Sequence, residues 1–163
     1  MAIDTTIGGA SSDSYGTLAA YQAYATSEGW ALADMDAENE VNLRKAARHI
    51  DRGYSFVGIR QYQVQARAWP RLVGNLVNDW PVNPDTIPAD IIYAQFELAY
   101  LMQGGLNPSA TIATTTTSES IKVGPITISE DTLPTAKPRI VVLEGLLRPY
   151  LTAGAGQIAL ARG

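Results

Sequence analysis

Cysteine is absent from the 163-residue chain, which excludes disulfide bridges, thiolate metal ligands and cysteine nucleophiles. Histidine occurs once, as His49, so a catalytic triad or a histidine-bound metal would depend on that residue alone. No apolar segment approaches the length of about 20 residues that a bilayer span requires. The first residues also lack the basic and apolar stretches of a signal peptide. These absences predict a protein made in a reducing cytoplasm and not exported.

Positive charge is also scarce. Lysine and arginine number 12 against 16 aspartate and glutamate residues, which gives a formal charge of −4 and an isoelectric point near 4.9. A chain with this balance is not expected to have a general affinity for nucleic-acid backbones. Its length suits one domain with a substantial hydrophobic core.

Helical patterns recur along the chain. Leu18, Tyr21, Tyr24 and Ala25 share a face of the first, and Leu43, Ala46, Ala47 and Ile50 share a face of the second, which we expect Asp36 to cap. The third is apolar on most of its circumference, and Pro149 ends or kinks the fourth. The predicted helices span residues 17–28, 36–52, 88–103 and 139–151.

A β-hairpin is predicted at residues 119–130, where apolar residues alternate with polar ones on both sides of Gly124-Pro125. The fold class is therefore mainly α, a small bundle of about four helices with one hairpin and flexible arms at both ends. We expect residues 1–14 to form an N-terminal arm, residues 15–152 the helical domain with its hairpin, and residues 153–163 a C-terminal arm.

The segment between residues 54 and 86 has no sustained period and reads as ordered irregular chain. Within it, Trp69, Pro70 and Arg71 follow one another. The proline requires an extended residue before it, and we expect the indole to fill the core from a loop. These three residues are therefore predicted to be structural.

Catalytic chemistry is not indicated. His49 lies two residues from Asp51 on one predicted helix, and residues at that spacing do not face each other. The favoured interpretation is a histidine near a helix C-terminus, although a site built around it stays a minor alternative. The acidic residues Asp34, Asp36, Glu38 and Glu40 fit helix capping. We predict no enzyme activity, no catalytic residue, no cofactor and no metal.

A nucleic-acid interpretation depends on the locally basic middle of the chain. Aromatic side chains there could stack on bases, and arginines could contact phosphates. Arginine with aromatic residues is equally typical of protein interfaces, and the acidic total charge favours protein partners. The residues concerned are Arg44, Lys45, Arg48, Arg52, Arg60, Arg67 and Arg71, with Tyr54, Phe56, Tyr62 and Trp69.

Several short motifs occur in a characteristic order: Ser12-Asp13-Ser14-Tyr15, Trp69-Pro70-Arg71, Ile87-Pro88 before Glu97-Leu98-Ala99, the hairpin, and Leu146-Leu-Arg-Pro-Tyr150. In this order the chain resembles the head–tail connector, or adaptor, family of tailed bacteriophages from about Ser11 to Arg162. Sequences of that kind are often described as DnaT-like single-stranded-DNA-binding proteins.

The resemblance implies a structural virion protein that takes part in head completion and virus assembly. It would be made in the host cytoplasm and located at the head–tail interface. It would form a dodecameric ring between the portal protein and a tail-side connector, stopper or tail-terminator protein. Double-stranded DNA would pass through the ring, and neither a membrane nor catalysis would be involved. The alternative left open is a single-stranded-DNA-binding accessory protein.

Two candidate contact segments follow from the resemblance. The resemblance implies that a C-terminal arm binds the portal, and apolar residues beyond flexible glycines suit strand addition to a partner's sheet. This portal-binding arm would comprise Gly156, Gln157, Ile158, Ala159, Leu160, Ala161 and Arg162. The hairpin would contact a neighbouring subunit or the tail side through Ile121, Lys122, Val123, Gly124, Pro125, Ile126, Thr127 and Ile128.

Overall fold

A computed structural model describes residues 2–74, 76–77, 80–108, 122–123, 126–127 and 140–152. The chain divides into two compact units, one formed by Met1–Leu106 with Ile140–Gly163 and one by Asn107–Arg139. The predicted portal-binding arm, residues 156–162, lies outside the described residues.

The first two helices follow the predicted ranges closely. Helix α1 spans Leu18–Glu28, where the Oγ1 of Thr17 accepts a hydrogen bond from the Ala20 N–H, 3.1 Å away, and Gly29 ends the helix in a left-handed conformation. Helix α2 spans Asp36–Gly53. The prediction that Asp36 caps α2 is wrong by one residue. Met35 is the cap, and the Asp36 carboxylate accepts a hydrogen bond from Gln22 of α1 instead.

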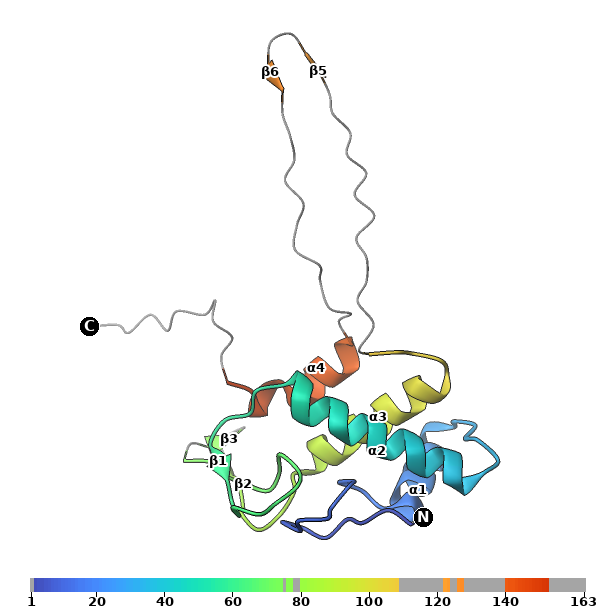
Figure 1. The fold of residues 1–163 in the computed structure, drawn as a ribbon, viewed down its shortest axis with the longest axis vertical. Helices are drawn as coiled ribbons and strands as arrows, with labels where there is room; N and C mark the ends of the chain where they lie inside the picture. Colours follow the sequence, from blue (N-terminus) through green and yellow to red (C-terminus); the bar gives the residue numbers. More distant parts are fainter. Residues whose placement is uncertain are drawn as a thin grey trace, which may run out of the picture. The chain divides into compact units, whose positions relative to one another are not determined.

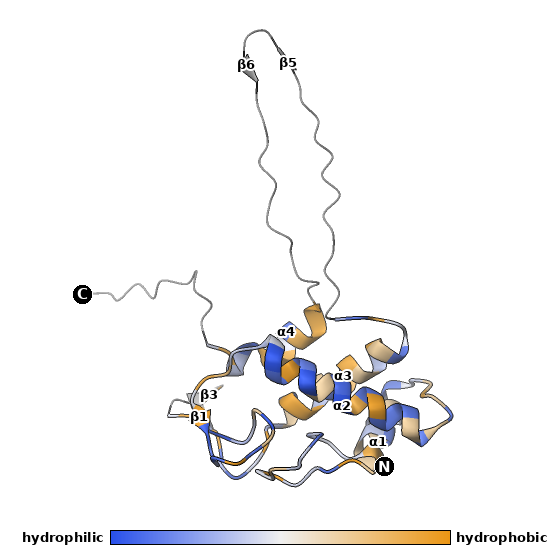
Figure 2. Cartoon of the chain, viewed as in Figure 1, coloured by the Kyte–Doolittle hydropathy of each residue, from blue (hydrophilic) through white to orange (hydrophobic). Residues whose placement is uncertain are grey.

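Helix α3, Ala89–Gln103, is the central helix of the first unit. It packs against α2 on one side and against α4 on another (Figure 1). Figure 2 shows hydrophilic and hydrophobic residues alternating along α2, whereas α3 and α4 are mainly hydrophobic. A helix covered on several sides is expected to be apolar around most of its circumference. The buried side chains of α3 are Ile91, Ala94, Gln95, Phe96, Leu98 and Ala99.

The fourth predicted helix is shorter than expected. Helix α4 covers Val141–Leu147, and a 3₁₀ turn, Arg148–Tyr150, continues it. Pro149 lies inside that turn. A proline cannot donate the hydrogen bond of a further α-helical turn, so the chain tightens there and leaves the helix.

The irregular segment contains two small antiparallel sheets that its sequence does not signal. Strand β1 (Ile59–Arg60) pairs with β2 (Arg71–Leu72), and β3 (Leu76–Val77) pairs with β4 (Trp80–Pro81). In the second unit, β5 (Lys122–Val123) pairs with β6 (Ile126–Thr127), with Lys122 opposite Thr127. This pairing confirms the predicted hairpin.

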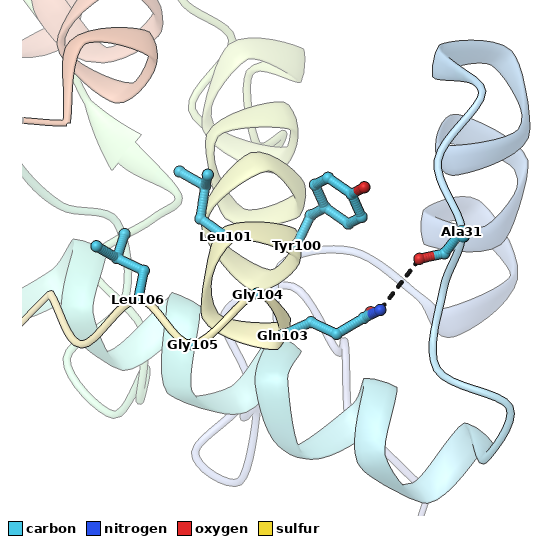
Figure 3. Close-up of a pocket in the computed structure, with 7 residues that line it drawn as sticks. All are labelled: Ala31, Tyr100, Leu101, Gln103, Gly104, Gly105 and Leu106. Atoms are coloured by element: carbon cyan, nitrogen blue, oxygen red, sulfur yellow. Dashed lines mark hydrogen bonds between the residues drawn. The ribbon is translucent and has the colours of Figure 1, made fainter.

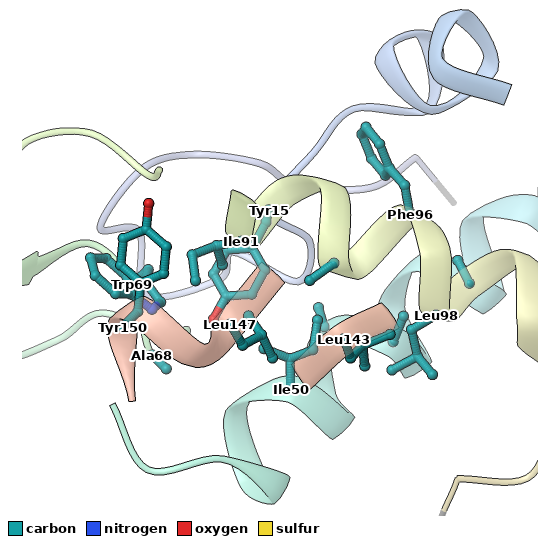
Figure 4. Packing of buried hydrophobic residues seen from close by; sticks show 14 of the residues in the cluster. Tyr15, Ile50, Ala68, Trp69, Ile91, Phe96, Leu98, Leu143, Leu147 and Tyr150 are labelled. Atoms are coloured by element: carbon teal, nitrogen blue, oxygen red, sulfur yellow. The ribbon is translucent and has the colours of Figure 1, made fainter. Parts of the chain in front are cut away.

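The hydrophobic core joins the helices to the irregular segment (Figure 4). Trp69 is 1% exposed, and its peptide bond to Pro70 is cis. The indole meets Phe56 and Tyr150 edge to face, at centroid distances of 5.7 and 5.6 Å. The same buried cluster includes residues of α2, α3 and α4, among them Ile50, Ile91, Leu98, Leu143 and Leu147.

The N-terminal segment is anchored to the domain, although the sequence predicts residues 1–14 to be an arm outside the core. Ser12 and Ser14 are buried. The Asp13 N–H donates to the Asp4 carbonyl at 2.8 Å, and the Ala66 N–H donates to the Gly9 carbonyl at 3.0 Å. A sequence of small polar residues is typical of flexible chain, and these distant hydrogen-bond partners have no local sequence signal.

The segment after α1 returns to the end of α3. The Gln103 side chain donates from Nε2 to the Ala31 carbonyl at 3.0 Å (Figure 3), and Trp30 stacks on Tyr100. Within the described residues, no helix combines the length and the apolar content needed to cross a bilayer.

Candidate nucleic-acid interface

Basic residues are concentrated in one stretch of the chain. No lysine or arginine precedes Arg44, and none lies between Arg71 and Lys122. All seven basic residues of the first 121 positions therefore lie between residues 44 and 71. The structure separates them into a group bonded within the domain and a group that faces solvent.

Arg44 belongs to the internal group. Its Nε lies 2.6 Å from Asp13 Oδ2 and its guanidinium lies 3.5 Å from Glu40 Oε2. All three side chains are partly buried. The contact with Asp13 attaches the N-terminal segment to α2, so this arginine has a structural role.

Arg67 is also internal, because it lies 3.1 Å from Asp51 Oδ2. The other oxygen of Asp51 accepts hydrogen bonds from the Tyr15 hydroxyl and from the Ala68 N–H. Burial raises the pKa of Asp51, although Tyr15, Arg67 and Ala68 each act to lower it. Burial next to this carboxylate likewise raises the pKa of Tyr15 well above its ordinary value. Through these contacts Asp51 of α2 links Tyr15 of the N-terminal segment to Arg67 and Ala68 of the irregular segment.

Arg71 binds backbone carbonyls instead of a carboxylate. Its guanidinium donates to Val57 at 2.8 Å, to Ala68 at 3.2 Å, and to Phe56 at 3.3 Å, and a further bond reaches Gly58 at 2.5 Å. Burial lowers the pKa of Arg71. These bonds hold the loop from residues 56 to 58 against β2.

The exposed group lies on α2. Lys45, Arg48 and Arg52 follow one another at intervals of three and four residues, which places them on one side of the helix. That side is opposite the buried face of Leu43, Ala46, Ala47 and Ile50. All three side chains are exposed and form no ion pair with the described residues. We call Lys45, Arg48 and Arg52 the α2 basic stripe.

Arg60 is the remaining exposed cation of this stretch. It lies in β1 and faces solvent. Its positive charge lowers the pKa of Asp51 slightly and adds to the lowering of the pKa of Arg71. It therefore lies near the buried polar cluster and outside the α2 basic stripe.

Two of the four aromatic residues proposed to stack on bases cannot do so. Phe56 and Trp69 are buried against each other, so that part of the nucleic-acid interpretation is wrong. Tyr54 is half-buried and meets His49 edge to face. Tyr62 is exposed, and its hydroxyl donates to Asp85 Oδ1 at 3.0 Å.

The sequence interpretation missed Trp80. It lies in β4 with 76% of its surface exposed, more than any other aromatic side chain among the described residues. Its position beside Pro81 in a turn-rich stretch gave a signal, since a strand next to a proline commonly lies at an edge. This indole is the most accessible stacking surface in the first unit.

His49 is half-buried on α2, and its edge-to-face contact with Tyr54 has a centroid distance of 6.4 Å. Among the residues that the structure describes, no three histidine, aspartate or glutamate side chains gather so as to hold a metal ion.

A fold of this class, a small helical domain with a basic helix face, is compatible with binding a polyanion. The family model described as "Putative DnaT-like ssDNA binding protein" matches residues 1–163, and the chain belongs to that family. Comparison with curated proteins and with solved structures gave no match. The predicted resemblance is confirmed in its DnaT-like description, whereas the connector assignment stays a prediction.

Proposed function

We propose that this protein binds single-stranded DNA through the α2 basic stripe. The observation that carries the proposal is the exposure of Lys45, Arg48 and Arg52 on one helix side, without ion-pair partners among the described residues. The description of the family to which the chain belongs supports the same function. No catalytic step is part of the proposal.

The length of the stripe suits a short stretch of backbone. Arg52 lies seven positions after Lys45, and an α-helix rises about 1.5 Å per residue, so the stripe is about 10 Å long. Along the axis of a duplex, the phosphates of one DNA strand follow one another about every 3.4 Å, and they are further apart in an extended strand. Three cations at this spacing can contact about three phosphates.

The acidic remainder of the chain restricts where DNA can bind. Residues 1–43 and 72–121 contain no lysine or arginine, so helices α1 and α3 repel a phosphate backbone. A strand is therefore directed to α2. Weak overall affinity and strong sensitivity to salt are expected, because few phosphates are contacted and the total charge is −4.

The proposal is tested by measuring how a labelled oligothymidine binds to the full chain and to a variant with K45Q, R48Q and R52Q. We expect the variant to bind at least about tenfold more weakly, since each lost phosphate contact reduces affinity. A matched control, K122Q with K137Q and R162Q, removes the same formal charge elsewhere in the sequence. If the two variants lose the same affinity for oligothymidine, the loss depends only on net charge, and the proposal is contradicted.

A second candidate function is the adaptor ring between portal and tail. It is supported by an apolar surface on the β1–β2 pair that another protein could cover. On this surface Ile59 and Leu72 are opposite each other across the two strands, and they are 67% and 44% exposed. Exposed apolar patches mark protein contacts. The ring, the portal and the tail-side partner remain expectations from the resemblance.

The adaptor candidate has its own test. The full chain is sedimented with the portal ring encoded in the same genome, in parallel with a chain lacking residues 153–163. Retention of the full chain alone would support the adaptor function and a portal contact through residues 156–162. Absence of both chains from the portal fraction would count against it and leave the DNA-binding result unaffected.

A further inference from the structure

A second surface of the first unit has aromatic and acidic side chains. On α3, Tyr93, Glu97 and Tyr100 follow one another at intervals of four and three residues, so they lie along one side of the helix. Tyr24 of α1 and Trp30, which follows α1, pack onto that side. We call these five residues the aromatic–acidic face.

The rings of this face form two stacked pairs. Tyr24 lies on Tyr93 with a centroid distance of 5.0 Å and an interplanar angle of 22°, and Trp30 lies on Tyr100 at 4.3 Å and 5°. Tyr93 is 40% exposed, and the other three rings are half-buried. Packing of α1 on α3 thus leaves part of each ring accessible.

No cation among the described residues pairs with the carboxylates at this face. Glu97 accepts a hydrogen bond from the Tyr24 hydroxyl at 3.0 Å. Burial raises the pKa of Glu97, and the neighbouring carboxylate of Glu28 raises it further. Within the described part of the chain neither Glu97 nor Glu28 forms an ion pair, and α1 and α3 contain no lysine or arginine.

An open hollow adjoins the stacked pair of Trp30 and Tyr100. Its volume is about 510 Å³, and it is lined by Ala31, Tyr100, Leu101, Gln103, Gly104, Gly105 and Leu106 (Figure 3). Gln103 donates from Nε2 to the Ala31 carbonyl, whereas its Oε1 is buried and accepts no hydrogen bond from the described residues.

We propose that the aromatic–acidic face and its hollow bind an arginine side chain presented by a basic segment of a partner protein. A guanidinium combines a flat surface that stacks on aromatic rings with five N–H donors and a permanent positive charge. Those properties match the partly exposed rings of this face and the Glu97 carboxylate. The choice of a basic partner rests on charge complementarity, because phosphate groups would be repelled.

This site is independent of the proposed DNA function, since the face belongs to α1 and α3 and the basic stripe belongs to α2.

A lysine side chain is expected to bind this site more weakly than an arginine side chain. Its ammonium is compact and strongly hydrated, and it lacks the flat surface that stacks on rings. The site is therefore expected to discriminate between the two cations.

The test uses seven-residue peptides of alternating glycine and arginine, glycine and lysine, or glycine and citrulline. Binding to the full chain is measured by calorimetry and located by amide NMR shifts. We expect the arginine peptide to bind about threefold or more tightly than the lysine peptide and to shift resonances around residues 100–106. Citrulline, which keeps the shape without the charge, should not bind measurably.

Two matched variants complete the test. Glu97→Gln retains an acceptor for Tyr24 and is expected to weaken binding of the arginine peptide at least about fivefold. Glu38→Gln removes an exposed carboxylate of α2 and should leave binding unchanged. Equal binding of arginine and lysine peptides, or equal losses in both variants, would overturn the proposal. So would concentration-dependent self-association of the chain that Glu97→Gln abolishes, since the occupant would then be a second copy.

DNA binding by the two variants separates this inference from the proposed function. Glu97→Gln should bind oligothymidine as the unchanged chain does, because Glu97 is not on α2. Loss of peptide binding with intact DNA binding supports the arginine site. Intact peptide binding in a chain that does not bind DNA would contradict only the proposed function.

Discussion

Arg67 and Asp51 form an ion pair of 3.1 Å in which both side chains are largely buried. This contact changes how the basic middle of the chain is interpreted, because a buried arginine with a carboxylate partner is not available to a phosphate. Arg44 and Arg71 are bonded internally as well. Of the seven basic residues between residues 44 and 71, those exposed to a polyanion are therefore the α2 basic stripe and Arg60.

Removing the carboxylate of Asp51 should destabilise the fold. Asp51→Ala would leave the Arg67 charge, the Tyr15 hydroxyl and the Ala68 N–H without their common acceptor. The loss of one partner of a buried ion pair costs about 3–5 kcal/mol, and we expect that range in the free energy of unfolding measured with urea. The exposed Asp85 gives the comparison, and Asp85→Ala should cost less than about 1 kcal/mol. A similarly small loss in the free energy of unfolding for Asp51→Ala and Asp85→Ala would show that the Asp51 cluster does not stabilise the fold.

Gln95 should be required for attaching the N-terminal segment. It is fully buried, and its Oε1 accepts hydrogen bonds from the Tyr15 and Gly16 N–H groups at 3.1 and 3.0 Å. Its Nε2 donates to Ser14 Oγ at 2.7 Å and to the Leu43 carbonyl at 2.9 Å. Gln95→Leu keeps the volume but leaves buried polar groups unpaired, at about 1–3 kcal/mol each.

The measurement for Gln95 is hydrogen exchange of the Tyr15 and Gly16 amides. We expect faster exchange at both positions in Gln95→Leu, together with a lower urea midpoint. Gln22→Leu changes an exposed glutamine of α1 and serves as the control. Unchanged protection of the two amides in Gln95→Leu would mean that another group holds the segment.

Alkaline pH should unfold the domain through its tyrosines. Burial is the main cause that raises the pKa of Tyr21, Tyr24 and Tyr150 to about 12, whereas an unfolded chain has a tyrosine pKa of about 10. Between these values the folded state binds more protons than the unfolded state. The stabilisation is therefore complete below about pH 10 and is lost as the pH rises towards 12.

Absorbance of tyrosinate and urea denaturation at several pH values test this dependence. Tyr150→Phe should reduce the fall in stability above pH 10, because it removes one of the three groups. The same variant deletes the hydrogen bond to Asp90 of 2.9 Å, so its stability at pH 7 provides the reference. Ionisation of all eight tyrosines near pH 10 in a folded protein would contradict the account.

Tryptophan fluorescence should report the exposure of Trp80. Trp69 is 1% exposed, Trp80 is 76% exposed, and Trp30 is half-buried on Tyr100. Acrylamide should quench mainly Trp80, and Trp80→Phe should remove most of the quenchable emission. Trp30→Phe is the matched variant and should leave it largely in place. Persistent quenching in Trp80→Phe would mean that the other indoles are accessible.

The helices could be predicted because their apolar residues recur with the helical period, as Leu43, Ala46, Ala47 and Ile50 do in α2. The hairpin was predictable from alternation around Gly124-Pro125. Strands of two residues, such as β1, are too short to carry a period. Gln95 gave no signal either, since its partners Ser14 and Leu43 are distant in the sequence.

The candidate site was predictable in part. Lys45, Arg48 and Arg52 fall opposite the apolar face of α2, so helical spacing alone identifies them as exposed. The internal roles of Arg67 and Arg71 depend on contacts with Asp51 and with backbone carbonyls in other segments. Only the folded chain brings those groups together.

The salt dependence of DNA binding tests the central claim most directly. The affinity of the full chain for oligothymidine is measured between low and moderate salt concentrations, beside the variant with K45Q, R48Q and R52Q. Three phosphate contacts on a single strand predict a slope of about −2 for the logarithm of affinity against the logarithm of salt concentration, and a slope near zero for the variant. A full chain without measurable binding at low salt, or a variant with an unchanged slope, would contradict DNA binding by the α2 basic stripe.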